Sequence, residues 1–176
     1  MTEITLTPQQ VEQAVQYAVR VDREARARNQ ARTIETKKTD RSASSLGYKA
    51  QLAFCLMLGF QWNPKIDYKN ANVGQIYKVR GRQRHAGNPS PALLVREKDR
   101  DDLVFVHVTT EDGVTFRCEG WIRGADAKRE GKRSDFGYGP SYAVQRSLRS
   151  MESLPIDHSL DGKKPEDAKT NGDSFE

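Results

Sequence analysis

Long apolar runs are absent from this 176-residue chain, in which 36% of the residues are hydrophobic and 30% are charged. A helix that crosses a bilayer needs about 18–20 consecutive apolar residues. The first residues, Met1 to Thr7, also lack the basic start and the apolar stretch of a secretory signal. We therefore expect a single-core protein of the cytoplasm, or of the host cytoplasm if the gene is phage-borne, with no membrane partner.

Cysteine and histidine are also scarce. Cys55 and Cys118 are far apart and form no C-x-x-C pair, which excludes a disulfide framework and a zinc ribbon. The histidines, at positions 85, 107 and 158, show no metal-ligand spacing. The sequence has no Walker phosphate loop, Gly-x-Ser-x-Gly elbow or Gly-x-Gly-x-x-Gly fingerprint. We therefore predict no bound metal or other cofactor, and no nucleotide hydrolysis or acyl transfer.

Positive charge, in contrast, is plentiful and unevenly placed. The net charge is +5, and residues 65–100 carry nine Lys and Arg against three Asp and Glu. Residues 151–176 have the opposite balance, with three basic against seven acidic residues. A basic middle segment is typical of a chain with an anionic partner, although a solvated face is the alternative.

Periodicity predicts an α/β (α+β) domain. Thr7 and Gln10 form a capping box before an amphipathic helix at Pro8–Gln30, and an apolar central helix runs from Ser44 or Ser45 to Gly59. Four runs of alternating residues then predict a largely antiparallel meander: Val73–Arg84, Ala92–Arg96, Leu103–Thr109 and Val114–Ile122. Short helices are expected near Gly124–Ala127 and Tyr142–Leu148.

The chain accordingly divides into an N-terminal helix and linker (1–45), a core (46–154) and a tail (155–176). The tail is acidic and has almost no large apolar residue, so we expect it to be disordered, with few packed contacts.

Four cations recur at every second position of the first predicted strand: Lys78, Arg80, Arg82 and Arg84. We call them the basic row. Alternation places all four on one face of a strand, where they would repel one another in isolation but would bind an anionic phosphate backbone. The alternative is an edge strand whose charges prevent aggregation.

Several short motifs follow one another between Leu46 and Leu154: Gly47-Tyr48-Lys49-Ala50-Gln51-Leu52-Ala53, Leu58-Gly59, Asn72-Val73-Gly74, Lys78-Val79-Arg80, Glu119-Gly120-Trp121-Ile122, Gly124-Ala125-Asp126-Ala127, Pro140-Ser141-Tyr142-Ala143-Val144 and Leu148-Arg149-Ser150-Met151-Glu152-Ser153-Leu154. Their order resembles that of small phage-borne proteins of the PD-(D/E)XK nuclease superfamily. The resemblance implies a restriction-endonuclease-like core, with a central helix on a four-stranded, mostly antiparallel or mixed sheet.

The resemblance also implies where an active site would lie. Active members place a Glu on the central helix, an Asp on a strand, and an acid and a Lys two residues apart on the next strand. The matching positions are Gln51, Asn72, Lys78 and Arg80. None of them carries the carboxylate that Mg²⁺ needs, and loss of the acids removes repulsion towards phosphate. We therefore expect these four side chains to share one pocket that does not cleave.

These observations predict a catalytically degenerate, phage-encoded protein of nuclease fold that binds DNA or RNA through the basic row. Two alternatives remain. The first is a Mg²⁺-dependent endonuclease with relocated acids, drawn from Asp67, Glu97 and Asp99. The second is a protein-interaction module, for example an inhibitor of a host defence factor, whose partner would be a host protein.

Overall fold

The computed structural model describes residues 2–28, 37–64, 69–135 and 139–160. The helices are α1 (Pro8–Arg28), α2 (Lys37–Leu58) and α3 (Gly124–Glu130). The strands are β1 (Glu3–Thr5), β2 (Tyr77–Gln83), β3 (Leu93–Arg96), β4 (Val104–Thr110), β5 (Thr115–Arg123), β6 (Lys132–Asp135) and β7 (Pro140–Val144), followed by two 3-10 turns at Met151–Ser153 and His158–Leu160. None of the helices in these ranges is long and apolar enough to cross a bilayer.

The main sheet has four strands in the order β1-β5-β4-β2. β5 runs antiparallel to both β1 and β4, whereas β2 runs parallel to β4 from Tyr77 opposite Val104 to Gln83 opposite Thr110. The mixed α and β architecture predicted from the sequence is confirmed. The simple meander is wrong, because a parallel pair needs a crossover and β3 lies within that crossover.

A second, smaller sheet has the order β3-β7-β6 and is antiparallel throughout. Residues Pro140–Val144 form its central strand, so the helix expected near Tyr142–Leu148 is wrong, while the short helix expected at Gly124 is present as α3. Pairing with β3 and β6 overrides the local preference of this segment, as tertiary context often does for short elements.

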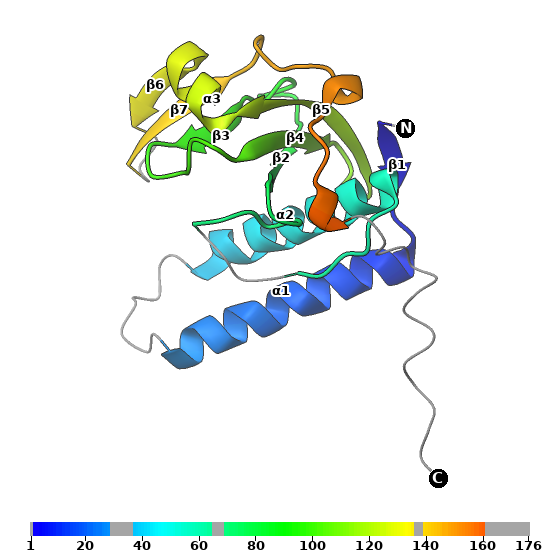
Figure 1. The fold of residues 1–176 in the computed structure, drawn as a ribbon. Coiled ribbons are helices and arrows are strands. Elements are labelled where there is room, and N and C mark those ends of the chain that lie inside the picture. Colours follow the sequence, from blue (N-terminus) through cyan, green and yellow to red (C-terminus); the bar gives the residue numbers. More distant parts are fainter. Residues whose placement is uncertain (1, 29–36, 65–68, 136–138, 161–176) are drawn as a thin grey trace.

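The two faces of the main sheet pack against different layers (Figure 1). On one face, Val79 and Val106 join Ala53 and Phe54 of α2 in a core against which Val11 of α1 also packs. On the other face, Phe105 and Ile122 pack with Leu93 and Val95 of β3, and with Ala127 and Val144. The main sheet is therefore the middle layer, with helices on one side and the second sheet on the other.

Local signals define the ends of the two long helices well. The backbone N–H of Thr7 donates to Oε1 of Gln10 (2.8 Å), and the N–H of Gln10 donates to Oγ1 of Thr7 (3.2 Å). This reciprocal pair is the predicted capping box. Gly59 ends α2 with φ of 73°, a left-handed conformation that glycine adopts without strain. The start of α2 differs from the prediction, because the helix begins at Lys37 rather than at Ser44 or Ser45.

The part of the tail that the structure describes is packed, contrary to the expectation for 155–176. Tyr77 Oη donates to the carbonyl of Pro155 (2.5 Å) and accepts from the N–H of Asp157 (3.2 Å). The Asp157 carboxylate in turn accepts from the N–H of Gln75 (2.7 Å). Asp157 and Leu160 therefore pack against the core although Ile156 is exposed, and residues 161–176 lie outside the described ranges.

Gly81 marks the closest approach of β2 to α2. A Cβ atom placed there would lie 2.8 Å from Cβ of Ala50 and 3.2 Å from the carbonyl oxygen of Leu46. We predict that Gly81→Ala lowers the free energy of unfolding by about 1–3 kcal/mol, because the strand must move off the helix. Urea unfolding would measure the change. Gly47→Ala is the control, since a Cβ there meets nothing within 4 Å, and an equal loss in both variants would contradict this account.

Candidate nucleic-acid interface

Three members of the basic row, Lys78, Arg80 and Arg82, occupy every second position of β2, as predicted. Gly81 faces α2, and Val79 lies in the core with α2. Lys78, Arg80 and Arg82 therefore project from the opposite face of the sheet, since successive side chains of a strand alternate. Their neighbours in β4 are Phe105, His107 and Thr109, respectively. The row is real as a pattern, but its members differ greatly in their surroundings.

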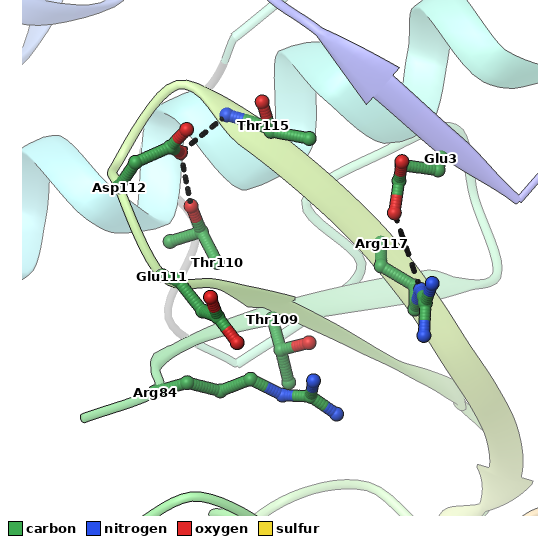
Figure 2. Close-up of a pocket in the computed structure, with 8 residues that line it drawn as sticks. All are labelled: Glu3, Arg84, Thr109, Thr110, Glu111, Asp112, Thr115 and Arg117. Carbon is green, nitrogen blue, oxygen red and sulfur yellow. Dashed lines mark hydrogen bonds and ion pairs between the residues drawn. The ribbon is translucent and has the colours of Figure 1, made fainter. Parts of the chain in front are cut away.

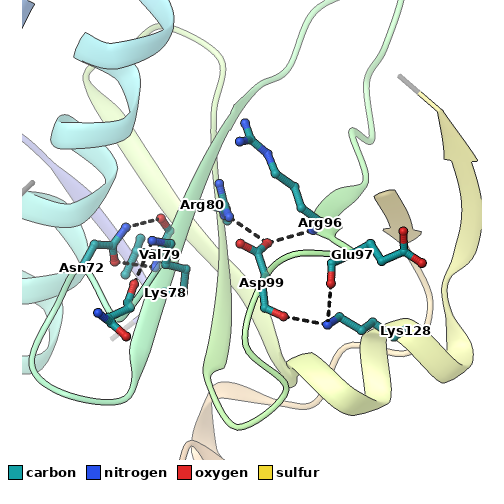
Figure 3. Close-up of polar contacts among 9 residues, drawn as sticks. Asn72, Lys78, Val79, Arg80, Arg96, Glu97, Asp99 and Lys128 are labelled. Carbon is teal, nitrogen blue, oxygen red and sulfur yellow. Dashed lines mark hydrogen bonds and ion pairs between the residues drawn. The ribbon is translucent and has the colours of Figure 1, made fainter. Parts of the chain in front are cut away.

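Lys78 is not a surface cation. The residue is only 5% exposed, and its Nζ donates to the backbone carbonyl of Asn70 at 2.8 Å (Figure 3). A buried ammonium that donates to the chain stabilises the loop before β2. Lys78 therefore cannot contact a bound polymer without a rearrangement, which corrects its assignment to an exposed row.

Arg80 is neutralised by a carboxylate. Its terminal nitrogen lies 3.0 Å from Oδ2 of Asp99, which also accepts the backbone N–H of Arg96 at 2.8 Å. The guanidinium lies over the ring of Phe105, 5.8 Å from its centroid. Burial lowers the pKa of Arg80, although Asp99 acts in the opposite sense. Arg80 ties β2 to the loop between β3 and β4, so a structural role explains it (Figure 3).

Arg84 is also paired with a carboxylate. A terminal nitrogen of Arg84 lies 2.8 Å from Oε1 of Glu119, and the same oxygen accepts a hydrogen bond from the hydroxyl of Thr109. Glu119 is the extra residue of a β-bulge, because His107 pairs with Gly120 and Val108 with Cys118. The bulge places the carboxylate beside Arg84.

A shallow pocket of about 430 Å³ opens beside Arg84, and Figure 2 shows its lining. Arg84 and Thr109 lie on one side, and Arg117, paired with Glu3 at 3.3 Å, lies on the other. Asp112 is occupied by the turn between β4 and β5, where it accepts the N–H groups of residues 114 and 115. The lining mixes both signs of charge, so the pocket itself is not an anion site.

Arg82 is the member of the row that stays available. It is partly exposed, and in the described part of the chain it has no hydrogen bond or ion pair with an acidic side chain. It flanks buried His107, whose Nε2 bonds to the carbonyl of Pro91 at 2.9 Å. Burial lowers the pKa of His107, and the positive charges of Arg82 and Arg84 lower it further. At the end of β2, Arg82, which has no acidic partner among the described residues, therefore lies near Arg84, which is paired with Glu119.

The four positions matched to the nuclease superfamily do not share a pocket. Asn72 lies at the edge of β2, where its side chain exchanges two hydrogen bonds with the backbone of Val79, at 2.8 and 3.0 Å. Lys78 and Arg80 lie next to it (Figure 3). Gln51 belongs to α2, on the other side of the sheet, and is buried, with no hydrogen-bond partner for its Oε1 among the described residues. The expected single pocket is therefore wrong.

The acids considered for a relocated metal site have other partners or lie outside the described ranges. Glu97 is exposed and lies 3.5 Å from Arg133. Asp99 forms an ion pair with Arg80 and accepts a hydrogen bond from the backbone N–H of Arg96. Asp67 lies in 65–68, which the structure does not describe. Among the described residues, His, Cys, Asp and Glu side chains form no group of three or more that could hold a metal ion.

The structure draws attention to cations that the analysis of the sequence overlooked. Lys128, Arg129, Lys132 and Arg133 fall within six residues, and Lys132 and Arg133 begin the edge strand β6. The run Lys-Arg-Glu-Gly-Lys-Arg is a visible signal. In a balance of charge along the chain, the neighbouring acids Asp126, Glu130 and Asp135 offset this run.

Comparison with family models, with curated protein sequences and with solved structures gave no match for this chain. The resemblance to the PD-(D/E)XK superfamily therefore stays a prediction. The class of protein that the fold defines is an α+β domain with a mixed four-stranded sheet and a second, smaller sheet.

Proposed function

We propose that the protein binds the phosphate backbone of a nucleic acid, without cleaving it, at the end of β2 around Arg82. The observation that carries the proposal is the state of Arg82, a partly exposed strand cation with no acidic partner in the described part of the chain. A cation left uncompensated releases counterions from the phosphate that it contacts, and this release favours binding.

The residues around Arg82 support this role. Arg84 lies two residues further along the chain, and its partner Glu119 is partly exposed, with 24% of its side chain accessible. The Arg84–Glu119 pair is about three-quarters buried, so a phosphate that displaces Glu119 has to compensate the Arg84 charge in its place. The interface is therefore Arg82 and Arg84, rather than all four members of the basic row.

Binding without cleavage is favoured by the partners of the nearby acids. Asp99 shares its carboxylate between Arg80 and a backbone N–H, and Glu97 lies in an exposed turn beside Arg133. A site for Mg²⁺ needs several oxygens that converge on an open position. Both acids instead bridge elements of the fold.

Replacing Arg82 tests the proposal. We expect Arg82→Gln to make the slope of log K against log salt shallower by about one on double-stranded DNA, because one phosphate contact is lost. Fluorescence anisotropy between about 50 and 200 mM salt measures this slope. Arg23→Gln, which removes an exposed cation of α1 on the other side of the sheet, is the matched control.

Three results would contradict the proposal. Equal slopes for the two variants would remove Arg82 from the interface. Cleavage that requires Mg²⁺ and is lost in Asp67→Ala or Glu97→Ala would favour the endonuclease. Absence of binding to DNA and RNA, together with capture of a defined host protein that Arg82→Gln abolishes, would favour the protein-interaction module.

A further inference from the structure

One row of side chains crosses the main sheet and connects Arg82 with the pocket beside Arg84. In order from β2 to β1, the register of the strands gives this row as Arg82, Thr109, Arg117 and Glu3. The residues next to it, Val108 and Cys118, lie in the core with α2, so the row is on the other face of the sheet. Neighbouring strands are about 4.8 Å apart, which places the Cα atoms of Arg82 and Arg117 about 10 Å from each other.

The pocket begins where the row reaches β4. Thr109, Arg117 and Glu3 all contribute to its lining, and its volume is about 430 Å³ (Figure 2). Clefts of about 300–1,000 Å³ hold small molecules in proteins. The pocket therefore has room for one nucleobase, and it adjoins Arg82 through Thr109.

The hydroxyl groups of the threonines in the lining already have partners within the protein. The hydroxyl of Thr109 donates to Glu119, that of Thr110 accepts the N–H of Gly113, and that of Thr115 bonds to the hydroxyl of Thr5. The charged side chains of the lining are therefore the groups that decide which ligand fits.

Two of these charged groups are available to a ligand. Glu111 is exposed, and in the described part of the chain its carboxylate has no hydrogen bond or ion pair. Arg117 lies 3.3 Å from Glu3, and both side chains are 53% exposed, so water screens this pair and a ligand can replace it at small cost. The pocket thus offers one carboxylate that accepts hydrogen bonds and one guanidinium that donates them.

We infer that this pocket binds one unpaired guanine of a single-stranded nucleic acid whose backbone lies on Arg82. The inference rests on the proposed function and adds the form of the nucleic acid and the base. Guanine has two N–H donors side by side, at N1 and N2, which a carboxylate such as Glu111 accepts together. It also has the acceptors O6 and N7, which an arginine contacts with two hydrogen bonds. Thymine has a single N–H donor and no amino group, so it satisfies Glu111 less well.

The form of the nucleic acid follows from which edge of the base is used. In a duplex, N1 and N2 of guanine are engaged in pairing and the major groove presents only O6 and N7. Proteins that read the pairing edge bind bases that are unpaired and turned outwards. The distance fits as well, because about 10 Å corresponds to at most about three nucleotides at the rise of 3.4 Å per nucleotide of a stacked strand.

The test uses a strand of about 12 thymidines, within the usual range of single-strand site sizes, and the same strand with one central dG. We expect the native protein to bind the dG strand about tenfold more tightly than the thymidine strand. It should also bind the dG strand more tightly than the duplex formed with its complement. Glu111→Gln is expected to lose most of the preference for dG, and Arg117→Gln to weaken binding of the dG strand more than that of the thymidine strand.

Glu12→Gln is the matched control, because it removes an exposed carboxylate of α1 on the other side of the sheet and should keep the preference for dG. Both Glu variants lose one negative charge, so any general gain in affinity is common to them, and only the ratio of the two strands reports the pocket. Equal affinity for the two strands, tighter binding of the duplex, or an unchanged ratio in Glu111→Gln would overturn this inference while leaving the effect of Arg82→Gln on the salt slope intact. Absence of binding to any nucleic acid would overturn the proposed function as well.

Discussion

Replacement of Asp99 with Asn is expected to lower the free energy of unfolding by about 2–4 kcal/mol, one of the two largest effects of a change in this protein. The Asp99 carboxylate is 7% exposed and compensates Arg80, whose Nε has no hydrogen-bond partner and is buried. The substitution leaves the Arg80 charge without a counter-ion in a place where water compensates it only in part. Because 27% of the Arg80 side chain stays exposed, the expected loss is smaller than for a fully buried pair.

The loss should depend on the unpaired charge rather than on the loop. Arg80→Met combined with Asp99→Asn removes both charges and is expected to be more stable than Asp99→Asn alone. Asp102→Asn, in the same loop, breaks an exposed ion pair with Arg100 and should change stability little. Urea unfolding of the four proteins measures these differences. A double variant less stable than Asp99→Asn would contradict the account.

Deletion of residues 155–176 is expected to destabilise the protein by about 2–4 kcal/mol, because it removes a buried carboxylate and its hydrogen bonds. Asp157 is 4% exposed and accepts from the N–H of Gln75 at 2.7 Å, and from the N–H and hydroxyl of Ser159 at 2.9 and 2.6 Å. The carbonyl of Pro155 also accepts from Tyr77. A chain ending at Leu160 keeps these contacts and is the control, and equal melting temperatures for the two truncated chains would contradict the prediction.

The Asp157 carboxylate also predicts a dependence on pH. Burial raises its pKa, but the hydrogen bonds from Ser159, Gln75 and Ile76 together outweigh this effect, so its pKa lies below the ordinary value of 3.8. A lowered pKa means that the charged form stabilises the fold above the ordinary pKa, and that this contribution is lost as pH falls through the folded value. The difference in stability between the native protein and Asp157→Asn should therefore shrink below about pH 4. A difference that stays constant down to pH 2 would show that the charge is not involved.

Some features of the fold followed from local signals. The capping box of Thr7 and Gln10 and the left-handed Gly59 involve atoms within a few residues, so their geometry can be deduced from the sequence alone. The same holds for the alternation of β2.

The candidate site could be predicted only as a list of side chains. The sequence places four cations on one strand, but their partners come from distant positions: Asp99 is 19 residues from Arg80, and Glu119 is 35 residues from Arg84. Which cation stays available depends on these distant partners, because the loop between β3 and β4 supplies the acid that pairs with Arg80 and β5 supplies the acid that pairs with Arg84. The exposed cations of β6 were missed for a related reason, since the exposure of every residue of β6 follows from its place at the edge of the second sheet.

By itself, then, the sequence of this protein determined its basic character, its long helices, and the face of β2 from which the cations project, because these depend on composition and on periods of two and 3.6 residues. The tertiary structure decided that β2 runs parallel to β4, that Gln51 is separated from Lys78 by the sheet, and that Asp157 packs against the core. These depend on contacts between segments that are remote along the chain, such as Gln75 and Asp157, which are 82 residues apart. The local pattern of residues does not indicate which distant segment of the chain an element contacts.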